Sequence, residues 1–359
     1  SVLEKLSATW GKAKKKLILC GLMEKNEQLN AALDKLSEDP SVAILTETTA
    51  NLWGEKFNLC IDRLITTIDK KEEKQFTPDL LVTIGGAIIS KKIKAAFRRL
   101  QPQHHWHIDP TSKEMDTYQS LTQTIPVKPE YLFENLAAAT TPAKKSFAQT
   151  WIDRDNLTRR NHEGFLKQAP YSDFKVFETI IEAMPAASNF QMGNSATVRY
   201  VQLFDQRPDI FYNSNRGTSG IDGSTSTAIG AAVASGKPTT LVCGDLSFFY
   251  DANALWNQYI PSNFRIIIVN NAGGGIFRII QGPATSDELD DYFEVTQQRT
   301  AAPFAKMYNL FYRKADNLES LKKVMKNFYK DKGRAGILEI FTPRKENDKV
   351  LKAYFQSLK

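Results

Sequence analysis

Short runs of apolar residues alternate with stretches of helical periodicity over the first third of the chain. The strand signals lie at 16–20, 42–45, 80–84 and 105–108, the last of which includes two histidines, and each ends at glycine or at a polar residue. Apolar residues at helical spacing fill the gaps at 24–36, 57–68 and 90–100. This alternation predicts a parallel sheet covered by helices, because two parallel strands need a crossover connection between them.

A second alternation begins near residue 171. It comprises a helix at 173–183, strands at 190–192 and 210–212, a helix at 225–235, and strands at 239–243, 264–269 and 336–341. Residues 111–170 contain four prolines and a less regular pattern with a helical patch around 129–138, and we interpret them as a linker region. We therefore predict an α/β fold with two doubly wound parallel-sheet domains, one at 1–165 that includes the linker and one at 166–359.

Composition and charge narrow the class of protein. The chain has 359 residues, of which 42% are hydrophobic and 24% charged, as in soluble globular proteins. No apolar stretch approaches the roughly 20 residues that span a bilayer, so we expect no membrane partner. The net charge of +7 is modest, and its basic runs fit solvated helix faces. Without a recognisable nucleic-acid-binding module, we expect no nucleic-acid partner.

The three cysteines indicate the redox state of the cellular compartment. Cys20, Cys60 and Cys243 are odd in number, far apart and in apolar surroundings. They form neither a disulfide framework nor a zinc-ligand pattern, which favours a reducing, cytoplasmic location.

Two neighbouring strands of the second domain end in residues suited to a metal ion. Asp245 follows the strand at 239–243, and Asn270 and Asn271 follow the strand at 264–269. Parallel strands open at one edge of their sheet, where ligands of doubly wound folds bind. A carboxylate, an amide oxygen and a main-chain carbonyl suit Mg²⁺ that holds a diphosphate. The alternative is a pair of ordinary strand-to-helix turns, in which such residues are also common.

A second group of side chains is suited to carboxylates. Ser195 and Arg199 lie one helical turn apart after the strand at 190–192, and Arg216 follows the next strand. Guanidinium groups match carboxylates in bidentate fashion, so these residues predict an acid-binding crevice. The alternative is that each arginine pairs with an acidic neighbour on the surface.

Two other features of the first domain are weaker indications of a functional site. Gly85-Gly86 lacks the spacing of a dinucleotide fingerprint, and a tight turn explains it better. His105 and His107 would share one face of a strand, but no acidic or cysteine partner lies at ligand spacing.

Four segments carry a resemblance to a known family. They are MGNSATVR (192–199), NSNRGTSGIDGSTSTA (213–228), CGDLSFFYDANAL (243–255) and VNNAGGGIF (269–277). In this order they resemble the thiamine-diphosphate-dependent enzymes and, within them, the menaquinone-pathway synthases that act on 2-oxoglutarate and isochorismate. The resemblance is strong over about 190–280 and is extended to the rest by domain order.

The resemblance implies a role for each matching residue. Asp245, Asn271 and the carbonyl of Gly273 correspond to the ligands of Mg²⁺, for which Mn²⁺ is a possible substitute. Ile221 corresponds to the apolar wedge that bends thiamine diphosphate. The further cofactor-binding and substrate-binding positions are Leu246, Ser247 and Ile276, and Ser195, Arg199, Arg216 and Phe277. Leu246 stands where many thiamine enzymes have glycine, and Ala272 is often polar in relatives.

The resemblance also implies a reaction and an incomplete protein. The reaction is decarboxylation of 2-oxoglutarate, followed by conjugate addition of the four-carbon product to isochorismate. Family members have an N-terminal pyrimidine-binding domain with an activating glutamate, and they form homodimers or dimers of dimers. We expect that domain to be missing here, with no catalytic residue in this chain and no turnover by it alone.

Two alternatives remain open. One is another thiamine enzyme, similar to acetolactate synthase or oxalyl-CoA decarboxylase. The paired arginines count against it, because a pyruvate site needs fewer carboxylate-binding groups. The other is a non-catalytic nucleotide-binding module that uses the same sheet edge without Mg²⁺.

Overall fold

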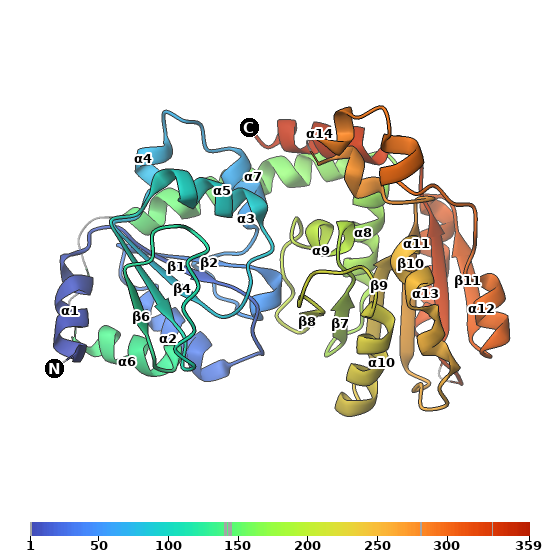
Figure 1. The fold of residues 1–359 in the computed structure, drawn as a ribbon, viewed down its shortest axis with the longest axis horizontal. Coiled ribbons are helices and arrows are strands. Elements are labelled where there is room, and N and C mark those ends of the chain that lie inside the picture. Colours follow the sequence, from blue (N-terminus) through green and yellow to red (C-terminus); the bar gives the residue numbers. More distant parts are fainter. Residues whose placement is uncertain (1, 140–141, 143–145, 281, 332) are drawn as a thin grey trace. The chain divides into compact units, whose positions relative to one another are not determined.

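Twelve parallel strands in two sheets organise the described part of the chain. The computed structural model describes residues 2–139, 142, 146–280, 282–331 and 333–359. It divides into unit 1, residues 1–163 with 358–359, and unit 2, residues 164–357 (Figure 1). Each unit holds one six-stranded sheet. The sequence prediction of two doubly wound parallel-sheet domains is confirmed.

The sheet of unit 1 has the strand order β3-β2-β1-β4-β5-β6. Its strands are β1 (Lys16–Cys20), β2 (Val42–Thr46), β3 (Phe57–Asn58), β4 (Leu80–Ile84), β5 (His104–Ile108) and β6 (Gln123–Ile125). The four predicted strands form its centre, and the chain adds the short strands β3 and β6 at the two edges. The residues of β1, β2 and β4 are all buried. Continuous apolar runs therefore form these strands, because both faces of a parallel sheet are covered.

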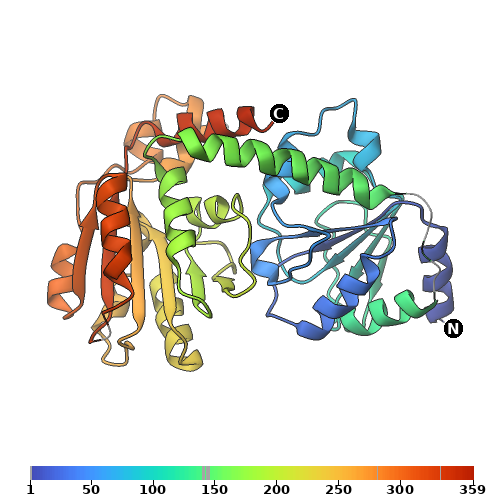
Figure 2. The same cartoon turned by 180° about the vertical axis from the view of Figure 1, so that it is seen from behind.

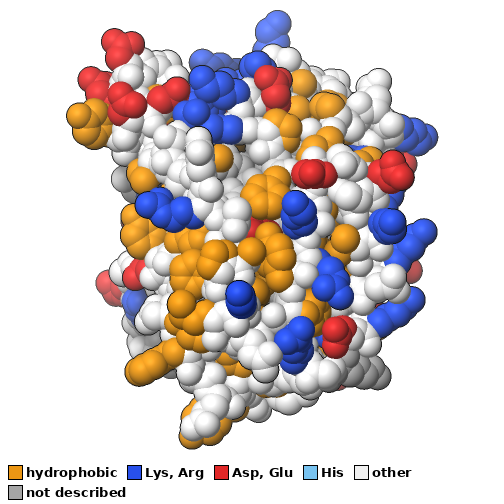
Figure 3. Space-filling model, turned by 90° about the vertical axis from the view of Figure 1, so that its right-hand side faces the viewer, with side chains coloured by type: hydrophobic (Ala, Val, Ile, Leu, Met, Phe, Trp, Pro, Cys, Tyr) orange, Lys and Arg blue, Asp and Glu red, His pale blue; other side chains and the backbone are white. Residues whose placement is uncertain are grey.

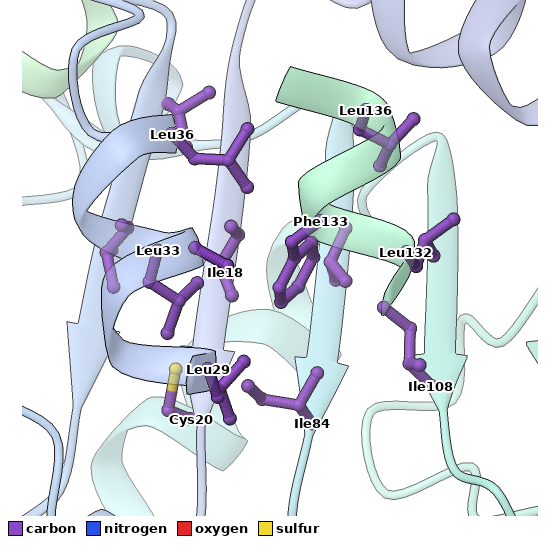
Figure 4. Packing of buried hydrophobic residues seen from close by; sticks show 14 of the residues in the cluster. Ile18, Cys20, Leu29, Leu33, Leu36, Ile84, Ile108, Leu132, Phe133 and Leu136 are labelled. Carbon is purple, nitrogen blue, oxygen red and sulfur yellow. The ribbon is translucent and has the colours of Figure 1, made fainter. Parts of the chain in front are cut away.

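Helices cover both faces of this sheet. They are α1 (Val2–Lys12), α2 (Glu27–Leu36), α3 (Ile61–Thr66), α4 (Glu73–Phe76), α5 (Lys91–Leu100), α6 (Pro129–Ala139) and α7 (Phe147–Gln168). On one face, Leu29 and Leu33 of α2 and Phe133 of α6 pack against Ile18 and Ile84 (Figure 4). On the other face, α3, α5 and the start of α7 contribute to a second buried cluster.

The interpretation of residues 111–170 as a linker is wrong for most of that segment, although α6 confirms the helical patch expected around 129–138. The structure has β6, α6 and the 22-residue helix α7 there. Helix α7 is anchored by Phe147 and the fully buried Trp151, which pack into the second cluster of unit 1. The many charged residues of α7 conceal this apolar stripe in the sequence. Residues 140–141 and 143–145 of the predicted linker lie outside the described residues.

The sheet of unit 2 has the order β11-β12-β10-β9-β7-β8. Its strands are β7 (Asn189–Met192), β8 (Phe211–Ser214), β9 (Thr239–Gly244), β10 (Phe264–Asn270), β11 (Phe311–Ala315) and β12 (Gly336–Phe341). The chain passes from β7 to β8 at one edge and returns to β9 on the other side of β7. The connections therefore diverge between β7 and β9, which is where doubly wound sheets bind ligands.

Helices also cover both faces of the second sheet. They are α8 (Asp173–Ala183), α9 (Ala196–Val201), α10 (Ser224–Ser235), α11 (Asp245–Tyr250), α12 (Ala302–Met307), α13 (Leu318–Phe328) and α14 (Asn347–Ser357). Helices α10, α11 and α12 lie on the face seen in Figure 1, and α8 and α13 lie on the opposite face (Figure 2). None of the helices in the described residues is both long and apolar enough to cross a membrane.

Candidate cofactor site at the sheet edge of unit 2

A cavity of about 280 Å³ lies at the carboxyl edge of the unit 2 sheet. Its walls come from the ends of β7, β9 and β10 and from the glycine-rich turn before α10. It is lined by Asn194, Ser195, Ala196, Thr197, Ile221, Gly244, Asp245, Leu246, Ser247, Asn271, Gly273, Gly274, Gly275, Ile276 and Phe277. Nine of the predicted site residues are in this set: Ser195, Ile221, Asp245, Leu246, Ser247, Asn271, Gly273, Ile276 and Phe277. The prediction that distant segments meet at one sheet edge is therefore confirmed.

Asp245 places a carboxylate in the wall of the cavity. It is the first residue of α11, directly after β9, and only 1% of it is exposed. Gln297 Nε2 donates a hydrogen bond to its Oδ2 at 2.5 Å. Burial raises the pKa of Asp245 to about 6, because desolvation disfavours its charged form. A cation bound at this carboxylate would oppose that effect.

Asn271 has the second candidate metal ligand. Its Nδ2 donates a hydrogen bond to Asp173 Oδ2 at 3.0 Å. Its Oδ1 is buried and has no hydrogen-bond partner in the described part of the chain. A buried polar atom without a partner is costly, so an unpaired amide oxygen in a ligand-sized cavity is a place for a bound group.

Gly273 brings the main chain to the same wall in a conformation that requires glycine. Its φ is +148°, and a Cβ placed there would lie 2.7 Å from the carbonyl oxygen of Glu294. Ala272, directly before it, also has a positive φ of 61°. The turn after β10 is therefore held in an unusual conformation at the point where the predicted carbonyl ligand lies.

The described residues fit a magnesium ion with oxygen ligands. Asp245 and Asn271 supply a carboxylate and a free amide oxygen, both hard ligands of the kind Mg²⁺ prefers. No group of three or more His, Cys, Asp and Glu side chains in the described residues could hold a metal by itself. A cation here would need ligand oxygens and water to complete its shell, as is common when Mg²⁺ binds with a phosphate.

The opposite wall depends on Asn194, which we did not single out from the sequence. Its Nδ2 donates to the carbonyls of Asn215 and Gly220, at 2.7 Å each, and so holds the glycine-rich turn beside β7. Ser247 Oγ donates to the carbonyl of Ile221 and fixes the same turn to α11. These three hydrogen bonds position Ile221 at the cavity.

Arg199 and Arg216 do not line the cavity but contact residues that do. Arg199 Nη1 donates to the carbonyl of Ser195, and Arg216 Nη1 donates to Asn194 Oδ1 at 2.6 Å. Ser195 itself has a φ of 71°, a strained value for a residue with a side chain. The role of the two arginines in substrate binding stays a prediction.

A buried polar network behind the cavity was not predicted from the sequence. Gln297 Nε2, which contacts Asp245, also lies 3.2 Å from Asn270 Oδ1. Asn270 Nδ2 donates to Glu339 Oε1 at 2.7 Å, and Tyr312 donates to the other oxygen of Glu339 at 2.7 Å. These residues are far apart in the sequence, and only the pairing of β10 with β12 brings Asn270 and Glu339 together.

Two histidines of β5, His105 and His107, are held by hydrogen bonds across the sheet. Thr83 Oγ1 lies 3.0 Å from His105 Nε2 and 2.9 Å from His107 Nδ1. Burial lowers the pKa of His105 to about 4, so its ring is neutral at physiological pH. These contacts give each ring a hydrogen-bond partner within the sheet.

The carboxyl edge of the unit 1 sheet is bridged by main chain between β1 and β4. Gly86 N donates to the carbonyl of Leu22 at 2.7 Å, and a Cβ on Gly21 would lie 2.2 Å from the carbonyl oxygen of Gly86. The glycines therefore allow a close approach of two loops, in agreement with the predicted tight turn.

Two family descriptions match the chain. "Middle domain of thiamine pyrophosphate" matches residues 3–190, and "Thiamine pyrophosphate enzyme, C-terminal TPP binding domain" matches residues 191–339. The second match includes every residue that lines the cavity. The chain belongs to the thiamine pyrophosphate enzymes.

The chain is also similar to individual curated proteins of that family. The chain is 45% identical over 356 residues to 2-succinyl-5-enolpyruvyl-6-hydroxy-3-cyclohexene-1-carboxylate synthase of Flavobacterium johnsoniae, covering 99% of this chain and 64% of the relative. It is 45% identical over 362 residues to the synthase of the same name from Christiangramia forsetii, covering 99% and 63%. The corresponding protein of Porphyromonas gingivalis is 35% identical over 348 residues, covering 94% and 60%. The chain therefore spans less than two thirds of the length of these relatives.

Proposed function

We propose that unit 2 binds thiamine diphosphate through a magnesium ion, and that the chain acts in the synthase reaction for which its relatives are named. The observation that carries the proposal is the buried, unpaired Oδ1 of Asn271 in the same cavity wall as the carboxylate of Asp245. In this proposal Asp245, Asn271 and the carbonyl of Gly273 hold the cation, which holds the diphosphate. Manganese would satisfy the same oxygen ligands.

The remaining lining residues would shape and orient the cofactor. Ile221 would support its bend, because two hydrogen-bonded anchors hold the turn that carries this side chain. Leu246 and Ser247 at the start of α11 would lie beside the diphosphate, and Ile276 and Phe277 would provide an apolar wall. When bound, thiamine diphosphate supplies an electron sink for decarboxylation of a 2-oxo acid.

The proposed substrates are 2-oxoglutarate, which loses CO₂, and isochorismate, to which the four-carbon product adds. Ser195, Arg199 and Arg216 would bind their carboxylates. Among their contacts, Arg199 donates to the carbonyl oxygen of Ser195 and Arg216 donates to the amide oxygen of Asn194. A carboxylate would be a stronger acceptor than either, because both partners would then be charged. None of the described residues that line the cavity is a glutamate, so we assign the activation of the cofactor to no residue of this chain.

We further propose that the protein is a cytoplasmic homo-oligomer in which two copies meet through unit 2. Hydrophobic side chains gather on the face that carries α12 (Figure 3). Tyr250, Trp256, Tyr259 and Met307 are large exposed residues of unit 2, and Trp256 is 80% exposed. Exposed apolar patches of this kind are typical of protein interfaces, and Trp and Tyr dominate their binding energy. Sedimentation of the chain and of Trp256→Ser tests this: a monomer for both would exclude the interface.

Calorimetry tests the cofactor proposal. Thiamine diphosphate is titrated into the chain with and without Mg²⁺, and ADP is titrated as the nucleotide alternative. Binding of thiamine diphosphate that requires Mg²⁺, and that is lost in Asp245→Ala and Asn271→Ala, is expected. Asn327→Ala on the exposed face of α13 is the matched control. Equal binding of ADP without Mg²⁺ would instead favour a nucleotide-binding module.

The substrate proposal needs a separate assay. Release of CO₂ is measured with 2-oxoglutarate or pyruvate, in the presence of thiamine diphosphate and Mg²⁺, using the full-length protein. Selective decarboxylation of 2-oxoglutarate, with consumption of isochorismate, is expected. A preference for pyruvate would indicate an enzyme similar to acetolactate synthase.

A further inference from the structure

A buried carboxylate contacts the proposed metal ligand Asn271 from outside the cavity. Asp173 is the first residue of α8, is 3% exposed, and does not line the cavity. Its Oδ2 accepts a hydrogen bond from Asn271 Nδ2 at 3.0 Å. Its Oδ1 accepts one from Thr342 Oγ1 at 2.6 Å. Both oxygens of this carboxylate therefore have defined partners.

This contact fixes which end of the Asn271 amide is free. Both oxygens of Asp173 accept hydrogen bonds, so the carboxylate faces the NH₂ end of the amide, which is the donor end. In the opposite orientation, Asn271 Oδ1 would face Asp173 Oδ2, and the NH₂ group would point away from this acceptor. With Nδ2 held by Asp173, Oδ1 is left without a partner and available to a cation.

Asp173 is itself held by residues that follow the end of β12. Its main-chain N–H donates to Asn347 Oδ1 at 2.8 Å. Thr342, which binds its Oδ1, donates its main-chain N–H to the carbonyl of Asn270 at 3.1 Å. The carboxylate is thus tied to α14 and to the loop after β12, and that loop is tied to the strand that carries Asn271. Such a shell limits the movement of the ligand it contacts.

We propose that Asp173 is a positioning residue that orients the amide oxygen of Asn271 toward the divalent cation. The inference rests on the proposed metal site and adds a residue to it that touches neither cofactor nor substrate. An acidic residue in the first turn of a helix also stabilises that helix by itself. The test therefore has to separate metal binding from stability.

Three variants make that separation. Asp173→Ala removes the carboxylate and frees the Asn271 amide. Asp173→Asn keeps the shape, and its amide can accept from Asn271 while donating to the Thr342 hydroxyl. Thr342→Val removes the second hydrogen bond of the carboxylate but leaves its contact with Asn271. Binding of Mn²⁺ in the presence of thiamine diphosphate is followed by electron paramagnetic resonance, and thermal unfolding is measured without metal.

The expected result is a loss of Mn²⁺ affinity of roughly 10–100-fold in Asp173→Ala, the range for residues that support metal ligands. Asp173→Asn should bind more tightly than Asp173→Ala, and Thr342→Val should bind like the unmodified chain even if it unfolds at a lower temperature. Unchanged affinity in Asp173→Ala would overturn the inference. Equal losses in Asp173→Ala and Thr342→Val, or in Asp173→Ala and Asp173→Asn, would also overturn it. An unmodified chain without Mn²⁺ binding would instead refute the metal site itself.

Discussion

Gly193 joins two walls of the cavity, and replacing it with alanine should destabilise unit 2. It follows β7, and its N–H donates to the carbonyl of Val242 in β9 at 2.8 Å. A Cβ at this position would lie 2.9 Å from Cys243 Cβ and 3.1 Å from Cys243 Cα. Because one of these atoms belongs to the main chain, the clash cannot be relieved by a side-chain rotation alone. The end of β7 would have to move away from β9.

Gly193→Ala should lower the free energy of unfolding of unit 2 by about 1–3 kcal/mol, the typical cost of overpacking when a methyl group is added to a well-packed core. Gly230 provides a control of opposite sign in the same unit. It lies inside α10, and a Cβ there would have no atom within 4 Å apart from its chain neighbours and the backbone of its own helix. Gly230→Ala should therefore stabilise the unit by about 0.5–1 kcal/mol, because alanine loses less backbone entropy in a helix.

Calorimetric unfolding measures both effects. A change of 1 kcal/mol shifts the melting temperature of a domain of this size by about 2–4 °C. Hydrogen exchange of peptides from β9 identifies the transition of unit 2 and locates the disturbance of Gly193→Ala. A Gly193→Ala variant as stable as the unmodified chain, with unchanged exchange in β9, would refute the close packing of β7 against β9. A destabilised Gly230→Ala would refute the comparison of the two sites.

Three further changes test other parts of the structure. Gly273→Ala should destabilise unit 2 by roughly 1–3 kcal/mol, as measured by urea unfolding, because its φ of +148° and the nearby Glu294 carbonyl oppose a side chain. Glu294→Ala leaves Arg278 and Arg344 without the fully buried carboxylate that both contact, so trypsin should cleave after Arg278 faster in a time course. Burial raises the pKa of Glu47 to about 7, so the folded state of unit 1 holds this proton more tightly than the unfolded state. The free energy of unfolding should therefore fall as the pH rises from about 4.5 to about 7. Denaturant titrations should show a weaker pH dependence for Glu47→Gln. An equal pH dependence in both proteins would contradict the raised pKa of Glu47.

The central strands could be predicted from the sequence because burial on both faces makes them continuously apolar. The segments 80–84 and 336–341 coincide with β4 and β12. Strand β11 escaped this reasoning because the middle of Phe311–Ala315 is exposed at the sheet edge and carries Arg313 and Lys314. Edge strands are often charged in this way, which removes the pattern that identifies a strand.

The cavity was predictable to the extent that its residues adjoin strand ends. Asp245 and Asn271 follow β9 and β10 directly, so the parallel sheet alone brings them to one edge. Their supporting partners were not predictable, because Asp173 and Gln297 reach them from other segments of the chain. The sequence likewise placed Arg199 and Arg216 near the crevice but did not reveal their contacts with Ser195 and Asn194.

The all-parallel pairing of both sheets has a consequence for how the protein folds. Every strand pairing in the described residues is parallel, so none can form as a local hairpin. Lys16 pairs with Leu80, and Asn189 pairs with Thr239. The central strands of each sheet can therefore pair only after a long intervening segment has been synthesised and has become compact. Chains dominated by such non-local contacts fold slowly. Nascent strands with unpaired edges are then exposed for longer, which makes synthesis at low temperature or with chaperones the condition of choice for obtaining the protein.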